Sequence, residues 1–534
     1  MSWRLGIDVG GTNTDAALLN PALECVASVK VPTTSDVTGG VAQAIAELMA
    51  HMPGLRAQVR YAMLGTTHCT NALVERRELQ RVGLLRLAAP ATEAVPPQSG
   101  WPQDLVDAFA LHHRIVRGGY EYNGTVLSEP DEAEVRATLR SWQGEVDAVA
   151  ICGVFAPVNA SQEHLVARWV RDELGSDTRI SLSSEIGSLG LLERENATIL
   201  NAALGGVARR AIGGFREALV RAGLGDAQLF LGQNDGTLLT LESAEAYPIL
   251  TLGCGPTNSL RGAAFLSGLC DALVMDVGGT TADIGVLLDA FPRESATAVD
   301  IGGVRLNLRM PDILALGLGG GTIVREQAGN LTLGPDSVGY RLTTQAQCFG
   351  GAVLTLTDVA IGAGAAPQIG SHPVQADRVL CLRAHARMVA DLEEGIDRMK
   401  VGAEAVPLVL VGGGSLLVPD TLKGISQVVR PPHFGAANAI GVAIAEIGAE
   451  VDRIVDLPAA TRSQVLAVLR AEAQAAAVAS GADPRGARVL TEEITPLAYL
   501  PGDAARVRIK AAGPLRVDAS PLSHPLTSVP GAQA

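Results

Sequence analysis

The sequence predicts an α/β protein with two related lobes and a small C-terminal α+β extension. A glycine turn between two apolar strands occurs twice, as LGIDVGGTNTDAALL over residues 5–19 and as LVMDVGGTTADIGVL over residues 273–287. Both copies carry one aspartate before the glycine pair and another after it. Predicted strands and helices alternate along the chain, which is typical of layered α/β domains. The repeat therefore indicates one such turn in each lobe.

The elements of the first half follow this plan. Apolar runs predict strands over residues 25–31, 83–88, 146–154 and 179–183. Helical spacing predicts helices over residues 38–50, 131–143 and 163–174. Residues 191–224 also have helical spacing, with internal glycine pairs that could break the helix.

The second half ends in a different composition. Helices are predicted over residues 376–400 and 436–447, and a strand over residues 407–419 runs into three glycines. An alanine-rich helix over 458–480 and alternating strands over 488–517 follow. We therefore expect an N-terminal lobe over 3–185, a second lobe over 190–456 and a C-terminal helix with strands over 457–517. Residues 518–534 lack periodicity and are expected to be disordered.

Composition limits the class of protein. A length of 534 residues allows several domains, and a net charge of −14 argues against a nucleic-acid binder. The seven cysteines include no C-x-x-C pair, so we expect reduced thiols and a cytoplasmic protein. The sequence shows neither a signal peptide nor an apolar run of about 18 residues, so no membrane segment is expected.

The two glycine turns are candidates for phosphate binding. Backbone amides and hydroxyl groups can bind a polyphosphate, and adjoining carboxylates can hold a hydrated divalent cation or orient an attacking water. The alternative is a hairpin turn that happens to carry two glycines, and the duplication argues against it. The candidate residues are Asp8, Gly10, Gly11, Thr12, Asn13 and Asp15 in the first turn, and Asp276, Gly278, Gly279, Thr280, Thr281 and Asp283 in the second.

A third glycine element follows a strand at residues 410–415. Gly412, Gly413, Gly414 and Ser415 would bring the backbone close to a flat group, such as a nucleobase with its ribose. Alone this signal is weak, but it gains weight when it follows two phosphate turns.

The chain resembles the hydantoinase A/5-oxoprolinase family, which includes acetone carboxylase subunits and belongs to the actin-like ATPase superfamily. The resemblance is carried by phrases in family order: DVGGTNTDA (8–16), GTTHCTNALVER (65–76), ERENATILNAAL (193–204), CGPTNSLRGA (254–263), MDVGGTTADI (275–284), DILALGLGGGT (312–322) and CFGGAVLTLTD (348–358). It implies a two-lobed actin-like fold of duplicated RNase H-like units. Relative to the family, this chain is a short and divergent member.

The resemblance also implies an activity: ATP-dependent opening of a hydantoin, 5-oxoproline or lactam, with ATP and Mg²⁺ as cofactors. Asp8 and Asp276 would hold the metal, and these two with Asp15 and Asp283 would form the catalytic set. Lesser candidates for substrate contact are Thr66, Thr67, Asn71, Asp312, Gly320 and Gly321. The implied partners are a small-molecule substrate and a hydantoinase B-type or other second subunit, in an oligomer.

The chain departs from the family pattern at two positions. Leu64 and Leu314 stand where family members usually carry histidines, and leucine cannot bind a metal. A metal or acid–base centre of the typical enzyme is therefore absent or rebuilt. His68 is a partial substitute, although an ordinary polar residue at a helix start is the favoured interpretation.

Two further groups of residues leave alternatives open. Glu193, Arg194, Glu195 and Asn196 form either a solvated first turn of a helix or a substrate-facing or interlobe cluster. Cys348 is more simply a buried thiol than a nucleophile, because no base partner is visible. The alternatives to the hydrolase are an ATP-binding regulatory or partner subunit, a carboxylase subunit and a small-molecule kinase of the same fold.

Overall fold

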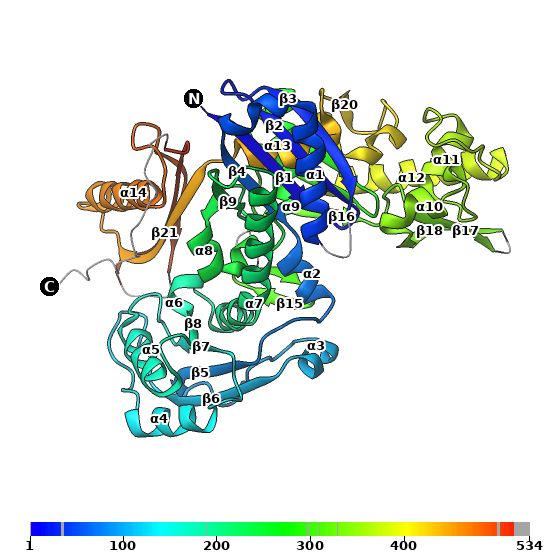
Figure 1. Ribbon diagram of the computed structural model, residues 1–534. Coiled ribbons are helices and arrows are strands. Elements are labelled where there is room, and N and C mark those ends of the chain that lie inside the picture. Colours follow the sequence, from blue (N-terminus) through cyan, green and yellow to red (C-terminus); the bar gives the residue numbers. More distant parts are fainter. Residues whose placement is uncertain are drawn as a thin grey trace. The chain divides into compact units, whose positions relative to one another are not determined.

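The computed structural model describes residues 2–33, 37–187, 189–295, 298–308, 310–327, 329–498 and 502–516. The chain forms two compact units, Ser2–Ala445 and a C-terminal unit that begins at Glu446 (Figure 1). Each unit is described by itself. The tail predicted to be disordered, residues 518–534, lies outside the described residues.

The first hairpin belongs to a mixed sheet. In the unit Ser2–Ala445 its strand order is β10-β9-β4-β1-β2-β3. β1 pairs antiparallel with β2 and parallel with β4, and β4 pairs parallel with β9. The bounds are β1 Trp3–Val9, β2 Asn13–Leu19, β3 Cys25–Pro32, β4 Val59–Thr66, β9 Gln228–Gly232 and β10 Leu238–Thr240. Helix α1 (Val37–His51) packs against β2 and β3 and against the long helix α7 (Leu191–Arg221).

The second hairpin repeats this topology. β11 pairs antiparallel with β12 and parallel with β19, which in turn pairs parallel with β20. The bounds are β11 Ala272–Val277, β12 Ala282–Leu288, β13 Phe291–Pro292, β16 Ile313–Leu316, β19 Val406–Val411 and β20 Ile425–Val429. Buried side chains of α12 (Arg378–Met399), among them Met388, Leu392 and Ile396, share a hydrophobic cluster with this sheet. A duplicated lobe is what the repeated turn predicted.

Two helices, α9 (Cys254–Ser267) and α13 (Ala437–Ile444), pack together between the sheets. α13 packs on β1 and α9 packs on β11, β12 and β19. Glycines lie where β1 meets α13 and where α13 meets α9: a Cβ at Gly6 would overlap the Ala439 carbonyl, and one at Gly441 would overlap the Asn258 carbonyl. A Cβ at Gly262 would likewise overlap the carbonyl of Ala437. The backbones therefore touch without intervening side chains.

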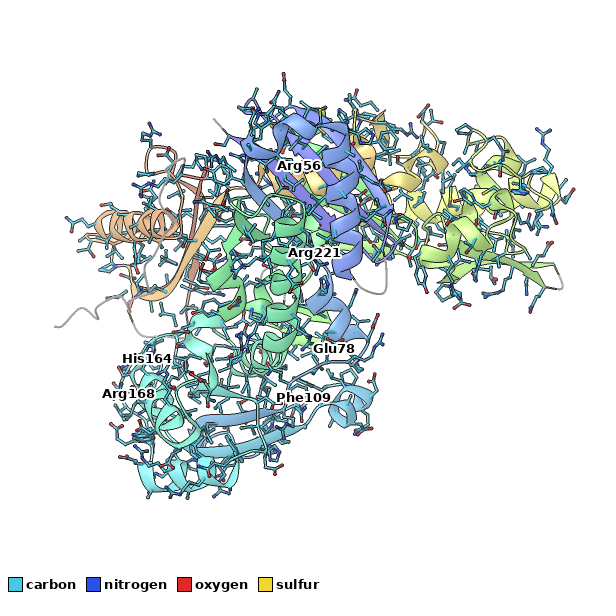
Figure 2. The ribbon with its side chains drawn as sticks, viewed as in Figure 1. Arg56, Glu78, Phe109, His164, Arg168 and Arg221 are labelled. Atoms are coloured by element: carbon cyan, nitrogen blue, oxygen red, sulfur yellow. The ribbon has the colours of Figure 1, made fainter. Side chains whose placement is uncertain are left out.

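A four-stranded parallel sheet is inserted into the first lobe, in the order β6-β5-β7-β8. Its strands are β5 Val82–Ala89, β6 Leu111–Arg117, β7 Ala148–Gly153 and β8 Arg179–Leu182. Helices α4 (Glu132–Ser141) and α5 (Ser161–Leu174) share a hydrophobic cluster with these strands. The exposed residues His164 and Arg168 lie on the outer face of α5 (Figure 2).

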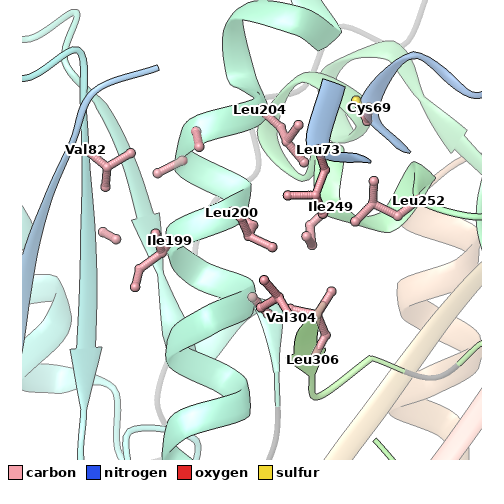
Figure 3. Packing of buried hydrophobic residues seen from close by; sticks show 14 of the residues in the cluster. Cys69, Leu73, Val82, Ile199, Leu200, Leu204, Ile249, Leu252, Val304 and Leu306 are labelled. Atoms are coloured by element: carbon pink, nitrogen blue, oxygen red, sulfur yellow. The ribbon is translucent and has the colours of Figure 1, made fainter. Parts of the chain in front are cut away.

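Helix α7 connects this inserted sheet to the rest of the unit. Figure 3 shows Ile199 on the side of Val82 in β5, and Leu200 on the side of Leu73 and Ile249. The glycine pairs at 205–206 and 213–214 do not break the helix, which is continuous over 31 residues. A Cβ at Gly205 would overlap the Arg179 guanidinium, so this glycine makes room for a neighbouring side chain.

The C-terminal unit is a small α+β structure, as predicted. Strands β21 (Ile447–Asp456), β23 (Ala504–Gly513) and β22 (Arg488–Pro496) form antiparallel pairs, with β23 in the middle. Helix α14 (Arg462–Ala479) packs on β21 and β23.

The strand pairing assigns three strands to other parts of the chain than the sequence analysis did. Strands β9 and β10 join the sheet of the first hairpin, and β21 belongs to the C-terminal unit, although the sequence analysis assigned all three to residues 190–456. The boundaries drawn from the sequence at 185–190 and 456–457 remain predictions.

The remaining elements are short. They are α2 His68–Val74, α3 Gln103–Ala108, α6 Ser183–Ile186, α8 Leu241–Ala246, α10 Leu342–Gln345, α11 Leu356–Ala363, β14 Val299–Ile301, β15 Val304–Leu306, β17 Thr322–Gln327 and β18 Asn330–Ser337. Among the described residues, no helix combines the length and the apolar character needed to span a bilayer.

Candidate active site

A cavity of about 510 Å³ lies between the two hairpin turns, and it contains most of the residues predicted to bind nucleotide. Of the twelve, eleven line its walls: Gly10, Gly11, Thr12, Asn13, Gly278, Gly279, Thr280, Thr281, Gly412, Gly413 and Gly414. Ser415 is fully buried behind the glycine loop and does not line the cavity. The cavity wall also includes Asp8, Asp15, Asp276 and Asp283.

The two turns have the same local geometry. Gly10 donates its backbone N–H to the Asn13 carbonyl at 3.0 Å, and Gly278 donates to the Thr281 carbonyl at 2.9 Å. In both hairpins the two aspartates are directly opposed, Asp8 to Asp15 and Asp276 to Asp283. The turns also approach each other, because a Cβ at Gly279 would lie 2.9 Å from the Thr12 side chain.

The glycine cluster at residues 319–321 braces the second turn. Gly320 donates its N–H to the Gly278 carbonyl at 2.9 Å, and Gly321 donates to the Gly279 carbonyl at 2.7 Å. Of the pair predicted to contact substrate, Gly320 lines the cavity and Gly321 does not. The cluster thus fixes the shape of the second turn.

The third glycine element sits against the same turn. Gly412 follows β19 with a φ of +82°, and a Cβ there would overlap Oδ1 of Asp276. Glycine is therefore required at this position both by the backbone conformation and by the space. This contact brings the loop at 412–414 to the edge of the second glycine turn.

The two aspartates that begin the turns are joined through helices α9 and α13. Asp8 accepts from the side-chain amides of Asn258 at 3.1 Å and Asn438 at 3.3 Å. The Ser259 hydroxyl lies 2.7 Å from Oδ1 of Asn438 and makes a short hydrogen bond with Asp276. The single proton of the Ser259 hydroxyl thus faces two acceptors, Asp276 and Oδ1 of Asn438. Exchanging the oxygen and nitrogen of the Asn438 side chain satisfies Ser259 but places the Asn438 oxygen against the Asp8 carboxylate. Every contact is therefore a hydrogen bond only when Asp8 or Asp276 is protonated.

Burial raises the pKa values of all four carboxyl groups. The pKa of Asp8 rises to about 6, and the pKa of Asp283 rises to about 7 through burial and the neighbouring charge of Asp276. Burial also raises the pKa values of Asp15 and Asp276, although the ammonium group of Lys30 opposes both increases. Such clustered carboxyl groups in a cavity are typical of a functional site.

The arrangement fits a magnesium ion that arrives with a nucleotide. Among the residues that the structure describes, His, Cys, Asp and Glu side chains form no group of three or more that could enclose a metal. Mg²⁺ does not need one, because it usually keeps several waters and binds one or two carboxylates together with phosphate oxygens. Asp8 and Asp276, on the wall of the same cavity, provide such a pair.

Four other predicted substrate residues lie away from the cavity wall. The Thr67 hydroxyl donates to the Val9 carbonyl at 3.0 Å, and Asn71 donates to Thr67 at 3.4 Å. Thr66 is buried and contacts the His68 ring. Asp312 forms an ion pair with Arg293 at 2.6 Å.

His68 begins a helix, and Leu64 and Leu314 lie among hydrophobic residues. His68 is the first residue of α2. Leu64 is buried in the hydrophobic cluster of the first lobe, whereas Leu314 packs against the cluster of the second lobe. The two leucines thus belong to different hydrophobic clusters.

The residues at 193–196 do not form a solvated helix turn. Arg194, Glu195 and Asn196 are buried, and Glu195 forms a two-bond ion pair with Arg86 at 2.5 and 2.6 Å. Arg194 donates to the Gly153 carbonyl at 2.6 Å. The solvated alternative is therefore wrong, because α7 packs this turn against β5 and β7.

Cys348 is buried, and burial raises the pKa of its thiol to about 12, as the packing interpretation expects.

Sequence reasoning missed four polar residues of the site: Lys30, Asn258, Ser259 and Asn438. Asn258 and Ser259 lie within the phrase CGPTNSLRGA, which was part of the family resemblance. The phrase itself does not indicate which side chains these two residues contact. Asn438 lies 430 positions from Asp8, so no local pattern marks their contact.

The strand topology defines a class of protein, the two-lobed actin-like ATPase fold, here with the same glycine turn in each lobe. Two family models place the chain more narrowly. A hydantoinase/oxoprolinase N-terminal region matches residues 4–174, and a hydantoinase/oxoprolinase domain matches residues 194–368. The chain belongs to the hydantoinase/oxoprolinase family, which confirms the resemblance seen in its motifs.

Two relatives are about a quarter identical to the chain over the aligned residues. It is 26% identical to the caprolactamase subunit alpha of Pseudomonas jessenii over 484 residues, which cover 85% of this chain and 68% of the relative. It is 25% identical to the acetophenone carboxylase gamma subunit of Aromatoleum aromaticum over 401 residues, which cover 67% of this chain and 53% of that subunit. Both relatives are named as subunits.

Two solved structures share the fold. The ATP-dependent caprolactamase from Pseudomonas jessenii aligns with a TM-score of 0.75 at 20% identity, over 98% of this chain and 90% of that chain. Nucleotide-free acetone carboxylase, an enzyme of ATP-dependent acetone carboxylation, aligns with a TM-score of 0.67 at 17% identity, over 96% and 88% of the two chains. These matches confirm the predicted fold class.

Proposed function

We propose that this chain is the ATP-binding subunit of an ATP-dependent hydrolase that opens a small cyclic amide of the hydantoin, 5-oxoproline or lactam type. The observation that carries the proposal is the cavity in which two phosphate turns and a glycine loop surround four carboxyl groups. The family membership and the caprolactamase relative support it.

The proposed chemistry explains why ATP is needed. An unstrained cyclic amide is a poor electrophile. Transfer of the γ-phosphoryl group to the amide oxygen, with release of ADP, makes the carbonyl carbon electrophilic enough for water to attack. Water then adds to this carbon and the C–N bond breaks, which leaves an acyl phosphate and a free amine. A second water hydrolyses the acyl phosphate, so the products are the ring-opened acid, ADP and phosphate. Mg²⁺ would neutralise charge on the phosphoryl oxygens.

Each group of residues has a role in this scheme. The amides and hydroxyls at residues 10–13 and 278–281 would bind the phosphates, and the loop at 412–414 would lie against the adenosine. Asp8 and Asp276 would hold the metal, while Asp15 and Asp283 complete the set of carboxyl groups opposite them. Preorganised donors of this kind stabilise charge as it develops in the transition state.

The test is turnover with purified protein. The chain, alone and together with a hydantoinase B-type subunit, is incubated with ATP, Mg²⁺ and a panel of hydantoins, lactams and ketones. We expect ADP release that rises with one of the cyclic amides, and a ring-opened product in the mass spectrum. If no compound stimulates ADP release in either preparation, the hydrolase proposal is wrong.

A second candidate is an ATP-binding regulatory or partner subunit, and the packed leucines Leu64 and Leu314 favour it. Calorimetry that shows ATP binding without turnover would support this role. Two other reactions on the same fold give distinct products: a kinase yields a stable phosphorylated compound, and a carboxylase requires bicarbonate and extends the carbon chain of a ketone.

A further inference from the structure

The cavity is strongly acidic for a site that must admit a polyphosphate. Among the described residues on its wall, the charged side chains are Asp8, Asp15, Asp276, Asp283 and the single cation Lys30. A magnesium ion offsets part of the nucleotide charge but leaves Mg²⁺-ATP negative. Lys30 is therefore the wall side chain able to provide a positive charge to the phosphate oxygens.

The position of Lys30 suits this task. It lies on β3 directly opposite Asp15 on β2, and its ammonium group forms an ion pair with Oδ1 of Asp15. The Lys30 side chain is 37% exposed, whereas that of Asp15 is 9% exposed. The Lys30 ammonium is the more exposed partner and carries three donor protons, so it can bond another anion in exchange for part of its contact with Asp15. A lysine ammonium on its flexible stem is suited to such an exchange.

Lys30 also acts across the cleft. It belongs to the first lobe, yet it lines the same cavity as Asp276 and the turn at residues 278–281 of the second lobe. Its ammonium group therefore faces a space that both hairpins enclose. This is where a phosphoryl group held between the two turns would pass to its acceptor.

We propose that Lys30 is a catalytic residue whose ammonium group contacts the terminal phosphoryl oxygens of bound ATP, and that Asp15 is a positioning residue that holds Lys30 in the cleft before nucleotide binds. The inference rests on the proposed function. Charge on these oxygens is redistributed during transfer, and a preorganised cation there stabilises the transition state. Bonds from ammonium to phosphate are charge-assisted and are stronger than neutral ones.

The test compares Lys30→Met and Lys30→Arg with the wild-type chain. The affinities of Mg²⁺-ATP and Mg²⁺-ADP are measured by calorimetry, and kcat is measured from ADP release. For Lys30→Met we expect ATP affinity to fall about tenfold, ADP affinity to change less than threefold, and kcat to fall about 10² to 10³-fold. Lys30→Arg should keep part of the ATP affinity. Lys423→Met, at an exposed lysine outside the cavity wall, is the matched control and should change neither quantity.

A structural role for Lys30 predicts different results. If Lys30 only neutralises Asp15, the double variant Asp15→Asn/Lys30→Met regains wild-type ATP affinity; if Lys30 contacts phosphate, the affinity stays low. Equal losses of ATP and ADP affinity, or full kcat in Lys30→Met, would overturn the inference while leaving the hydrolase proposal intact. A wild-type chain that neither binds nor hydrolyses ATP would overturn both.

Discussion

Asp8 and Asp276 occupy equivalent positions in the two hairpins, but their hydrogen-bond partners differ. Both oxygens of Asp8 accept from side-chain amides, whereas Asp276 contacts a serine hydroxyl through Oδ2. Oδ1 of Asp276 faces Gly412, at the edge of the cavity. Asp276 is therefore the less constrained of the two carboxyl groups, and under the proposed function it would be the better placed to hold a hydrated metal ion.

We expect Asp276→Asn to abolish nucleotide turnover and leave the fold intact. The amide is nearly isosteric but carries no charge, so the loss should be at least about 100-fold in kcat. ADP release measures the loss, and circular dichroism checks the fold. An unchanged rate would remove Asp276 from the mechanism.

Asp283 offers a prediction about pH and stability in nucleotide-free protein with chelator. Its pKa is about 7 in the folded chain against a usual 3.8, so ionisation opposes folding. The penalty is absent below the usual pKa, grows as the pH rises through 4 to 7, and is complete above about 7. A rise of that size corresponds to roughly 4 kcal/mol, which local relaxation should reduce to about 2 kcal/mol.

Asp283→Asn should therefore be more stable than wild type at pH 8 and equal to it near pH 4. Denaturant unfolding at the two pH values measures the difference. The exposed Asp226→Asn serves as control and should show no such pH dependence. Equal stabilities of Asp283→Asn and wild type at pH 8 would show that the charge at position 283 is well solvated.

At the scale of elements, the buried ion pair between Arg86 of β5 and Glu195 of α7 holds the inserted sheet to the long helix. Neither side chain is more than 1% exposed. Removing one member leaves an unpaired buried charge, so Arg86→Met should lower the free energy of unfolding by about 3–5 kcal/mol. Thermal or denaturant unfolding checks this value.

The double variant Arg86→Met/Glu195→Met separates charge from shape. Because two apolar side chains of similar volume can replace a buried pair, it should recover most of the lost stability. The exposed pair Arg210 and Glu78 is the comparison, and Arg210→Met should cost less than about 1 kcal/mol. If the double variant is no more stable than Arg86→Met, the cost lies in packing rather than in the unpaired charge.

For the whole molecule, ligand binding should be visible as stability. A ligand at 100 times its dissociation constant stabilises the folded state by about 2.7 kcal/mol. Mg²⁺-ATP should therefore raise the melting temperature by a few degrees, and chelation of the metal should remove most of the increase. Asp8→Asn, which would weaken the proposed metal site, should show a smaller metal-dependent increase. No shift with saturating Mg²⁺-ATP would contradict the assignment of the cavity.

Much of the fold was visible in the sequence because its signals are local. Each hairpin carries its strands, its turn and its two aspartates within 15 residues, and the second copy confirmed the first. Of the twelve residues that the same local reasoning predicted to bind nucleotide, eleven lie on the cavity wall. The twelfth, Ser415, does not, because the chain turns into a short helix after Gly412 and buries that side chain.

Long-range contacts account for what the sequence did not show. Asn258 and Asn438 contact Asp8 across 250 and 430 positions of the sequence, and no local pattern near either residue predicts the contact. The polar residues at 194–196 look solvated until β5 and β7 are placed beside them. Glycine pairs within a helix cost roughly 1 kcal/mol per residue, yet tertiary packing keeps α7 continuous.

The glycine contacts among β1, α13 and α9 have a consequence for how far the two lobes stand apart. Main chain rests on main chain at Gly6, Gly441 and Gly262, so the distance from β1 through α13 to α9 is set by backbone thickness, whereas α9 meets the second sheet through side chains such as Leu260. A side chain at any of these three glycines would push α9, and the second hairpin that packs on it, away from the first hairpin. The distance between the two turns therefore depends on three glycines that lie outside the cavity wall.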